Sequence, residues 1–92
     1  MFISQKRLKH IFRDAPGHLL DTSSNRQLLI DTASNLDYYL GKDRWGNDWY
    51  AQIQPNGTQV WVQIRQDQII NGGLNQIPRS WHPQLGLGEI NN

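Results

Sequence analysis

Histidines are the side chains of this 92-residue sequence best suited to proton transfer near neutral pH. His18 follows Gly17 in a segment that Pro16 keeps out of a helix, and the carboxylate of Asp21, three residues later, could orient its imidazole. The alternative is a loop histidine bonded to backbone, with Asp21 or Thr22 capping the next helix. We take His18 as the first candidate for a catalytic base or acid.

His10 is a second candidate because cationic residues surround it. Lys9 precedes it, and Lys6 and Arg13 fall on the same face of a predicted helix. Neighbouring positive charge favours a neutral imidazole, which can accept a proton. The alternative is an exposed helix histidine without a role. The third histidine, His82, has no partner in the pattern and is not a candidate.

The remaining residue pattern argues against several classes of site. The sequence has no Cys, its histidines are scattered and no carboxylates cluster with them, so we expect no metal and no other cofactor. It also contains no nucleophile elbow, phosphate loop or dinucleotide fingerprint. His, Lys, Arg and Tyr nevertheless suffice to cleave RNA. A base takes the 2′-hydroxyl proton, cations stabilise the charged phosphorane, and an acid protonates the leaving oxygen.

Positive charge is concentrated near the N-terminus, although the formal net charge is only +1. Lys6, Arg7, Lys9 and Arg13 all precede the first acidic residue, Asp14. So small a net charge exerts no global attraction on a polyanion. Nucleic-acid binding would therefore depend on this local distribution.

Hydrophobic patterning places the chain outside the membrane classes. No stretch approaches the roughly 18 apolar residues of a spanning helix. The first residues also lack the apolar run of a signal peptide. We expect a soluble protein made in the cytoplasm.

The first predicted helix is amphipathic. Ser4 can cap its N-terminus, and Leu8, Ile11 and Phe12 fall on one side of it. Its other side carries the N-terminal cations.

A second helix is predicted to begin at Ser24, which forms a capping box with Gln27. Its apolar residues recur at helical spacing as far as Leu40, and Gly41 follows where a C-terminal cap belongs. The pattern therefore predicts one helix that ends just before Gly41.

Alternating residues after Asn47 predict strands. If Asn56-Gly57 is a two-residue hairpin loop, the residues of one face pair as follows: Ile53 with Val60, Ala51 with Val62, and Trp49 with Ile64. A second turn at Gln66-Asp67 would bring Ile69 beside Ile64 and complete a three-stranded meander that ends near residues 71–73. Beyond Leu74 we expect loop and at most a short edge strand.

Together these elements predict one α+β domain over residues 1–92, with two N-terminal helices packed on one face of a small antiparallel β-meander. Val60, Val62 and Ile64 should be buried beneath the helices. A domain of this size buries only about two-thirds of its unfolded surface. Without Cys, packing alone must hold the core.

The opposite face of the predicted meander combines rings, amides and a guanidinium. The two-residue loop would place Tyr50 opposite Gln63, Gln52 opposite Trp61, and Asp48 opposite Arg65. Such a face suits RNA, because bases stack on aromatic rings, amides read base edges, and arginine binds phosphate. The alternative is ordinary cross-strand packing of polar strand residues.

Several runs of the sequence also resemble a known family, the C-terminal toxin modules of bacterial polymorphic and contact-dependent inhibition systems. In the first half these runs are Lys9 to Arg13, Gly17-His18, Asp21-Thr22, Asn25-Arg26 and Leu28-Leu29. In the second half they are Tyr39 to Asp43, Gly46 to Ala51, Gly57, Gln59 to Val62, Arg65, Ile70 to Gly73, Asn75, Pro78-Arg79 and Leu85 to Leu87. The resemblance spans nearly the whole chain.

The resemblance implies a small metal-independent ribonuclease of the barnase, EndoU, colicin and RelE group, with helices packed on an antiparallel sheet. It also implies RNA as substrate, with transfer RNA the first target to test, and an acidic immunity protein as partner. Members of that group use different catalytic residues, so the resemblance transfers no catalytic set.

Site residues are therefore assigned from the chemistry above. The catalytic candidates are His18, His10, Arg65 and Lys42. The substrate-binding candidates are Tyr50, Trp61, Arg13, Arg44, Lys9 and Gln63. Two rival hypotheses are a binding module for RNA or protein without catalysis, and a structural piece of a larger assembly.

Overall fold

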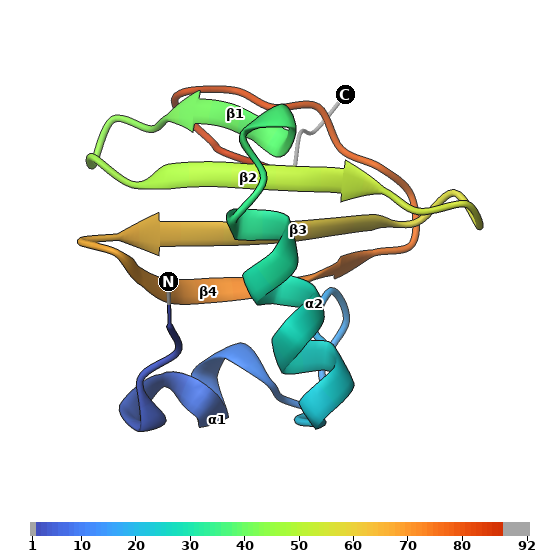
Figure 1. The fold of residues 1–92 in the computed structure, drawn as a ribbon. Helices are drawn as coiled ribbons and strands as arrows, with labels where there is room; N and C mark the ends of the chain where they lie inside the picture. Colours follow the sequence, from blue (N-terminus) through green and yellow to red (C-terminus); the bar gives the residue numbers. More distant parts are fainter. Residues whose placement is uncertain (1, 88–92) are drawn as a thin grey trace.

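The computed structural model describes residues 2–87, so Met1 and residues 88–92 of the predicted domain lie outside it. Its helical elements are a 3₁₀ turn at Gln5–Arg7, α1 at Leu8–Ile11, α2 at Ser23–Ala33 and a 3₁₀ turn at Leu36–Tyr38. Its strands are β1 at Tyr39–Lys42, β2 at Asp48–Ile53, β3 at Gln59–Arg65 and β4 at Gln68–Asn75. The strands form one antiparallel sheet in the order β1-β2-β3-β4, with both helices N-terminal to it (Figure 1). The predicted α+β class is confirmed.

The N-terminal helical segment begins at the predicted cap with a 3₁₀ turn that continues into α1, but it ends at Ile11, so Phe12 and Arg13 of the predicted helix lie beyond it. The Ser4 hydroxyl accepts a hydrogen bond from the backbone N–H of Lys6. Ile11 and Phe12 are buried in the core, whereas Lys9 and His10 are exposed. The segment therefore packs its apolar side inward and leaves its cations in water.

Helix α2 begins and ends earlier than predicted. Its cap is Thr22, whose hydroxyl accepts from the backbone N–H of Asn25 at 3.0 Å, and not Ser24. The helix stops at Ala33 because the next polar side chains bond locally: the Ser34 hydroxyl donates to the Ile30 carbonyl, and Asn35 caps the following turn.

The residues predicted as the last turn of that helix form strand β1 instead. Tyr39 pairs with Tyr50 and Gly41 with Trp49, so Gly41 lies within a strand and does not cap a helix. Leu36, counted toward the apolar face of the helix, is exposed. Pairing with β2 favours a strand here, although the leucine spacing alone predicts a helix.

The β2–β3 hairpin has a register one residue away from the predicted one. Gln52 pairs with Val60 and Tyr50 with Val62. The loop has three residues, 55–57, because the backbone N–H of Gln54 binds the Thr58 carbonyl at 2.8 Å. Gly57 closes it at φ +88°, the conformation expected at the third position of such a loop.

This one-residue difference exchanges the faces of β2. Val60, Val62 and Ile64 are buried under the helices, as predicted. Tyr50 and Gln52, however, lie on that same face, and Gln52 donates to the Thr32 hydroxyl of α2 at 2.7 Å. Trp49, Ala51 and Ile53 lie on the outer face with Trp61. The predicted pairs of Tyr50 with Gln63, Gln52 with Trp61 and Asp48 with Arg65 are therefore wrong.

One hydrophobic core lies between the helices and the inner sheet face. Its buried residues are Ile11, Phe12, Leu29, Ala33, Val60, Val62, Ile64 and Ile69. Helix α2 crosses the sheet, while α1 lies beside the β4 edge (Figure 1). Within residues 2–87, no helix is long and apolar enough to cross a membrane.

The β3–β4 hairpin forms at the predicted turn. Gln66 and Asp67 both have positive φ, as a two-residue type I′ loop requires, and Ile69 pairs with Ile64. Strand β4 continues beyond its predicted end to Asn75. From residue 76 to 87 the chain has no further helix or strand, apart from an isolated bridge of His82 with Gly86.

Candidate functional site

A pocket of about 190 Å³ opens on the outer face of the sheet. The loop that carries His18, strands β2, β3 and β4, and the C-terminal segment all contribute to it. Its lining residues are Pro16, Gly17, His18, Trp49, Trp61, Asn75, Arg79 and Leu87. The pocket therefore combines two indoles, one imidazole, one amide and one guanidinium.

Stacked indoles form one wall of the pocket. The rings of Trp49 and Trp61 lie 5.7 Å apart with planes inclined by 25°. Trp81, from the C-terminal segment, contacts Trp49 with ring centroids also 5.7 Å apart. Trp49 is 9% exposed, and its Nε1–H donates to Asp43 at 2.8 Å. These contacts fix the wall.

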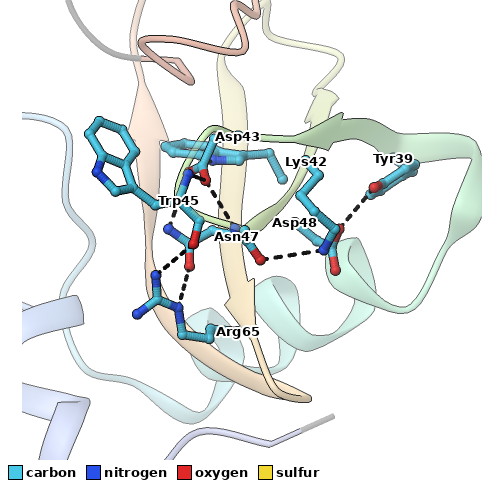
Figure 2. A network of polar contacts seen from close by, with 9 residues as sticks. Tyr39, Lys42, Asp43, Trp45, Asn47, Asp48 and Arg65 are labelled. Atoms are coloured by element: carbon cyan, nitrogen blue, oxygen red, sulfur yellow. Dashed lines mark hydrogen bonds and ion pairs between the residues drawn. The ribbon is translucent and has the colours of Figure 1, made fainter.

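The carboxylate of Asp43 organises the loop between β1 and β2 (Figure 2). It accepts from the backbone N–H groups of Trp45 and Asn47, each at 2.9 Å, from Asn47 Nδ2 at 3.2 Å, and from Trp49 Nε1. Burial raises the pKa of Asp43, but the hydrogen bonds from Trp49, Asn47 and Trp45 outweigh burial and lower it overall. The loop and the pocket wall thus share one buried acceptor.

Three cations predicted as site residues, Arg65, Lys42 and Arg44, belong to this loop network and do not line the pocket. Arg65 donates to Asn47 Oδ1 at 2.7 Å and to the Trp45 carbonyl at 3.0 Å. Lys42 lies 3.0 Å from the Asp48 carboxylate, which also accepts from the Tyr39 hydroxyl (Figure 2).

The third of these cations, Arg44, projects from the tip of the loop. Its guanidinium stacks over the ring of Trp45 at 4.1 Å and bonds Gln84. All three cations thus have structural partners in the described part of the chain, and none of them contributes to the pocket.

The imidazole of His18 is held at both nitrogens. Nδ1 lies 3.0 Å from the Ile11 carbonyl, and Nε2 lies 3.1 Å from Nη2 of Arg13. A carbonyl only accepts and a guanidinium only donates, so the neutral ring carries its proton on Nδ1 and a lone pair on Nε2. The edge of the ring contacts Trp61, with centroids 6.1 Å apart.

The predicted orienting group, Asp21, does not contact His18. It binds Arg26 through two hydrogen bonds, and the hydrogen bond from Arg26 lowers the pKa of Asp21. Its part is taken by the Ile11 carbonyl. This partner lies seven residues before His18, where the first helical segment ends, so sequence spacing gave no signal for it.

Backbone contact with β4 sets the position of the His18 loop. The Gly17 carbonyl accepts from the backbone N–H of Leu74 at 3.1 Å. A side chain at Gly73 would collide with that carbonyl, so only glycine permits this approach. The edge strand thus holds His18 against the pocket.

The other predicted site residues lie elsewhere. His10 and Lys9 are exposed on α1, and Tyr50 packs against the core on the inner face. Gln63 lies on the outer face, paired with Trp49, outside the pocket lining. The structure therefore brings together His18, Arg13 and Trp61.

Six lining residues were not predicted as site residues: Pro16, Gly17, Trp49, Asn75, Arg79 and Leu87. The correct hairpin register would have placed Trp49 beside Trp61 on the outer face. Arg79 and Leu87 come from the irregular C-terminal segment, where no periodicity signals their position.

Comparisons of the chain with protein-family models, with curated proteins and with solved structures find no match. Within residues 2–87, no group of three or more His, Asp or Glu side chains lies close enough to hold a metal ion.

Proposed function

We propose that this domain cleaves RNA without a metal ion and that the His18 pocket is its active site. The supporting observation is the arrangement of His18. Its Nε2 carries a lone pair, lies beside the guanidinium of Arg13, and borders a pocket walled by two indoles. A proton acceptor, a cation and stacking surfaces are what cleavage by a ribose 2′-hydroxyl requires.

Arg13 would connect substrate binding to activation of His18. Its exposed side chain holds His18 Nε2 through a single hydrogen bond. A phosphate accepts two parallel hydrogen bonds from a guanidinium and so competes for it. Binding of phosphate would draw Arg13 away and free Nε2 to act as a base.

The freed Nε2 takes the proton of the 2′-hydroxyl as the 2′-oxygen attacks the adjacent phosphorus. The bond from phosphorus to the 5′-oxygen breaks, that oxygen takes a proton from solvent, and a 2′,3′-cyclic phosphate remains. Arg13 and Arg79, whose side chain is exposed at the pocket, stabilise the negative charge of the phosphorane.

The resemblance to toxin modules supplies the biological side of the proposal. The domain would act in the cytoplasm of a target bacterium, with transfer RNA as the first substrate to test. An immunity protein would have to block the pocket. The exposed cations at the pocket, Arg13 and Arg79, favour an acidic partner.

A second candidate function is RNA binding without cleavage. His18 is the only histidine among the lining residues, and the lining holds no carboxylate, so the pocket offers one side chain suited to proton transfer. Stacked indoles and an arginine would suffice for binding.

A cleavage assay separates the two. Purified protein is incubated with total transfer RNA in excess chelator, and the new 3′ ends are analysed. The proposal predicts cleavage that survives the chelator, leaves 2′,3′-cyclic phosphate, and fails at a nucleotide whose ribose lacks the 2′-hydroxyl. Binding with intact RNA would support the second candidate, whereas cleavage lost to the chelator would contradict the metal-independent mechanism.

A further inference from the structure

Hydrogen bonds link the side chains of Gln59 and Asn75 and the backbone of Arg79 into an amide relay beside the pocket, and the orientation of its amide groups can be assigned. The side chain of Gln59 makes two hydrogen bonds to the backbone of Arg79: Nε2 donates to the carbonyl at 3.0 Å, and Oε1 accepts from the N–H at 3.0 Å. A carbonyl cannot donate and an N–H cannot accept, so the amide of Gln59 has only one possible orientation. Its Oε1 then also accepts from Asn75 Nδ2 at 2.9 Å.

This relay fixes which atom Asn75 presents to the pocket. Because Nδ2 is committed to Gln59, Oδ1 is the free end of the amide, and it has no hydrogen-bond partner among residues 2–87. Asn75 is 92% buried yet lines the pocket, and its Oδ1 faces Gly17, another lining residue. Asn75 Oδ1 is not among the fully buried side-chain atoms without a partner, so it remains accessible from the pocket, where a ligand or water can supply a donor.

We infer that the pocket binds a nucleobase that carries an exocyclic amino group, with Asn75 Oδ1 accepting a hydrogen bond from that group. Asn75 would be the specificity-determining residue and Gln59 the positioning residue. The inference rests on the proposed function in that it takes RNA as the ligand. A pocket of about 190 Å³ is smaller than the roughly 300–1,000 Å³ typical of sites for whole small molecules, which suits one ring system beside the indoles.

Matched nucleotide pairs test this inference without cleavage. Adenosine 5′-monophosphate is compared with purine riboside 5′-monophosphate, and cytidine 5′-monophosphate with its analogue lacking the amino group. Binding is followed by quenching of tryptophan fluorescence. Within any pair that binds, the amino-bearing member should bind roughly tenfold more tightly, the effect of one hydrogen bond.

Asn75→Leu should abolish this preference, because leucine has a similar shape and no acceptor. Gln59 would remain held by the backbone of Arg79 in this variant. The same replacement at Asn25, a half-buried residue of α2 outside the pocket lining, is the matched control and should leave the preference unchanged. If Asn75→Leu does not fold, the amide resonances of Asn75 in the wild-type protein provide a second test, since they should shift with the amino-bearing nucleotide only.

Equal binding of both members of each pair, a preference that survives in Asn75→Leu, or no binding of any nucleotide would overturn the inference. None of these results decides whether the domain cleaves RNA, because no bond is broken in the assay. Conversely, a protein that shows the amino preference but leaves RNA intact would retain the inference and lose the ribonuclease proposal.

Discussion

Replacing Asp43 by Asn tests the link between the β1–β2 loop and the pocket wall. The amide oxygen of Asn can still serve the backbone N–H groups of Trp45 and Asn47, which now bind Oδ1. Its NH₂ would face the two donors that bind Oδ2, the indole of Trp49 and the amide of Asn47. Two hydrogen bonds to a buried charge would thus be replaced by contacts between donors.

The expected loss follows from these contacts. A hydrogen bond to a charged group contributes about 1.5–3 kcal/mol, and a buried donor left without a partner costs about 1–3 kcal/mol. Relaxation of the loop recovers part of the loss, so we expect Asp43→Asn to lower the free energy of unfolding by about 2–4 kcal/mol. For a domain of this size that corresponds to a decrease in Tm of roughly 10–30 °C.

The effect should depend on pH with a defined sign. The folded pKa of Asp43 is lowered relative to its unfolded value of about 3.9. Its stabilising contribution is therefore complete above that value and disappears as the pH falls through the folded pKa. The stability difference between wild type and Asp43→Asn should be full near neutral pH and should shrink in acid.

Urea unfolding followed by far-UV circular dichroism at about pH 7 and pH 3 measures both quantities. Asp14→Asn is the control, because Asp14 is exposed and its replacement should change stability by less than about 0.5 kcal/mol. A variant at position 43 as stable as wild type near neutral pH would refute the reasoning, as would a difference of the same size at both pH values.

Two further predictions concern the site. Gly73→Ala should lower the free energy of unfolding by about 1–3 kcal/mol and slow RNA cleavage, because the new methyl group would push the Gly17 carbonyl and with it the His18 loop. Gly57→Ala, whose added methyl meets open space outside the pocket, is the control and should lower only the stability measured by thermal unfolding. Equal cleavage by both variants would argue against this role for Gly73. The affinity for RNA, measured by fluorescence anisotropy, should fall steeply with salt concentration, and Arg13→Ala should reduce the slope of log affinity against log salt by about 1. Affinity that does not change with salt would contradict binding through phosphate contacts and would favour a protein partner instead.

The sequence predicted the buried face of the central strand β3 correctly but missed the edge strand β1. Alternation of Val60, Val62 and Ile64 was enough to assign the buried face of β3, because three β-branched residues at period two leave no competing pattern. Strand β1 was missed because Leu36 and Leu40 continue the helical spacing of α2. Only the chance to pair with β2, a non-local contact, decides against the helix.

Loop length decided how much of the site could be predicted. Asn56-Gly57 is typical of two-residue hairpin loops, yet Pro55 also belongs to the loop, and the added residue moves Trp49 to the outer face. Two of the predicted site residues, His18 and Trp61, line the pocket, and their roles stay predictions. The relay joins Gln59 to Asn75, sixteen positions away, and to the backbone of Arg79, twenty positions away, and no local pattern encodes it.

The central claim is that His18 acts as the base of an RNA-cleaving site, and the single-turnover cleavage rate of His18→Asn tests it most directly. The Asn amide can still donate to the Ile11 carbonyl, so the loop keeps its anchor while the proton acceptor at Nε2 is lost. We expect the rate to fall by roughly 10²- to 10⁴-fold with thermal stability little changed, and His82→Ala, which removes an imidazole from the C-terminal segment, to cleave at the wild-type rate. Cleavage by His18→Asn at the wild-type rate would contradict the account and move the role of base to His10. If His10→Ala is then equally active, or if the wild-type protein cleaves no RNA, the ribonuclease proposal fails.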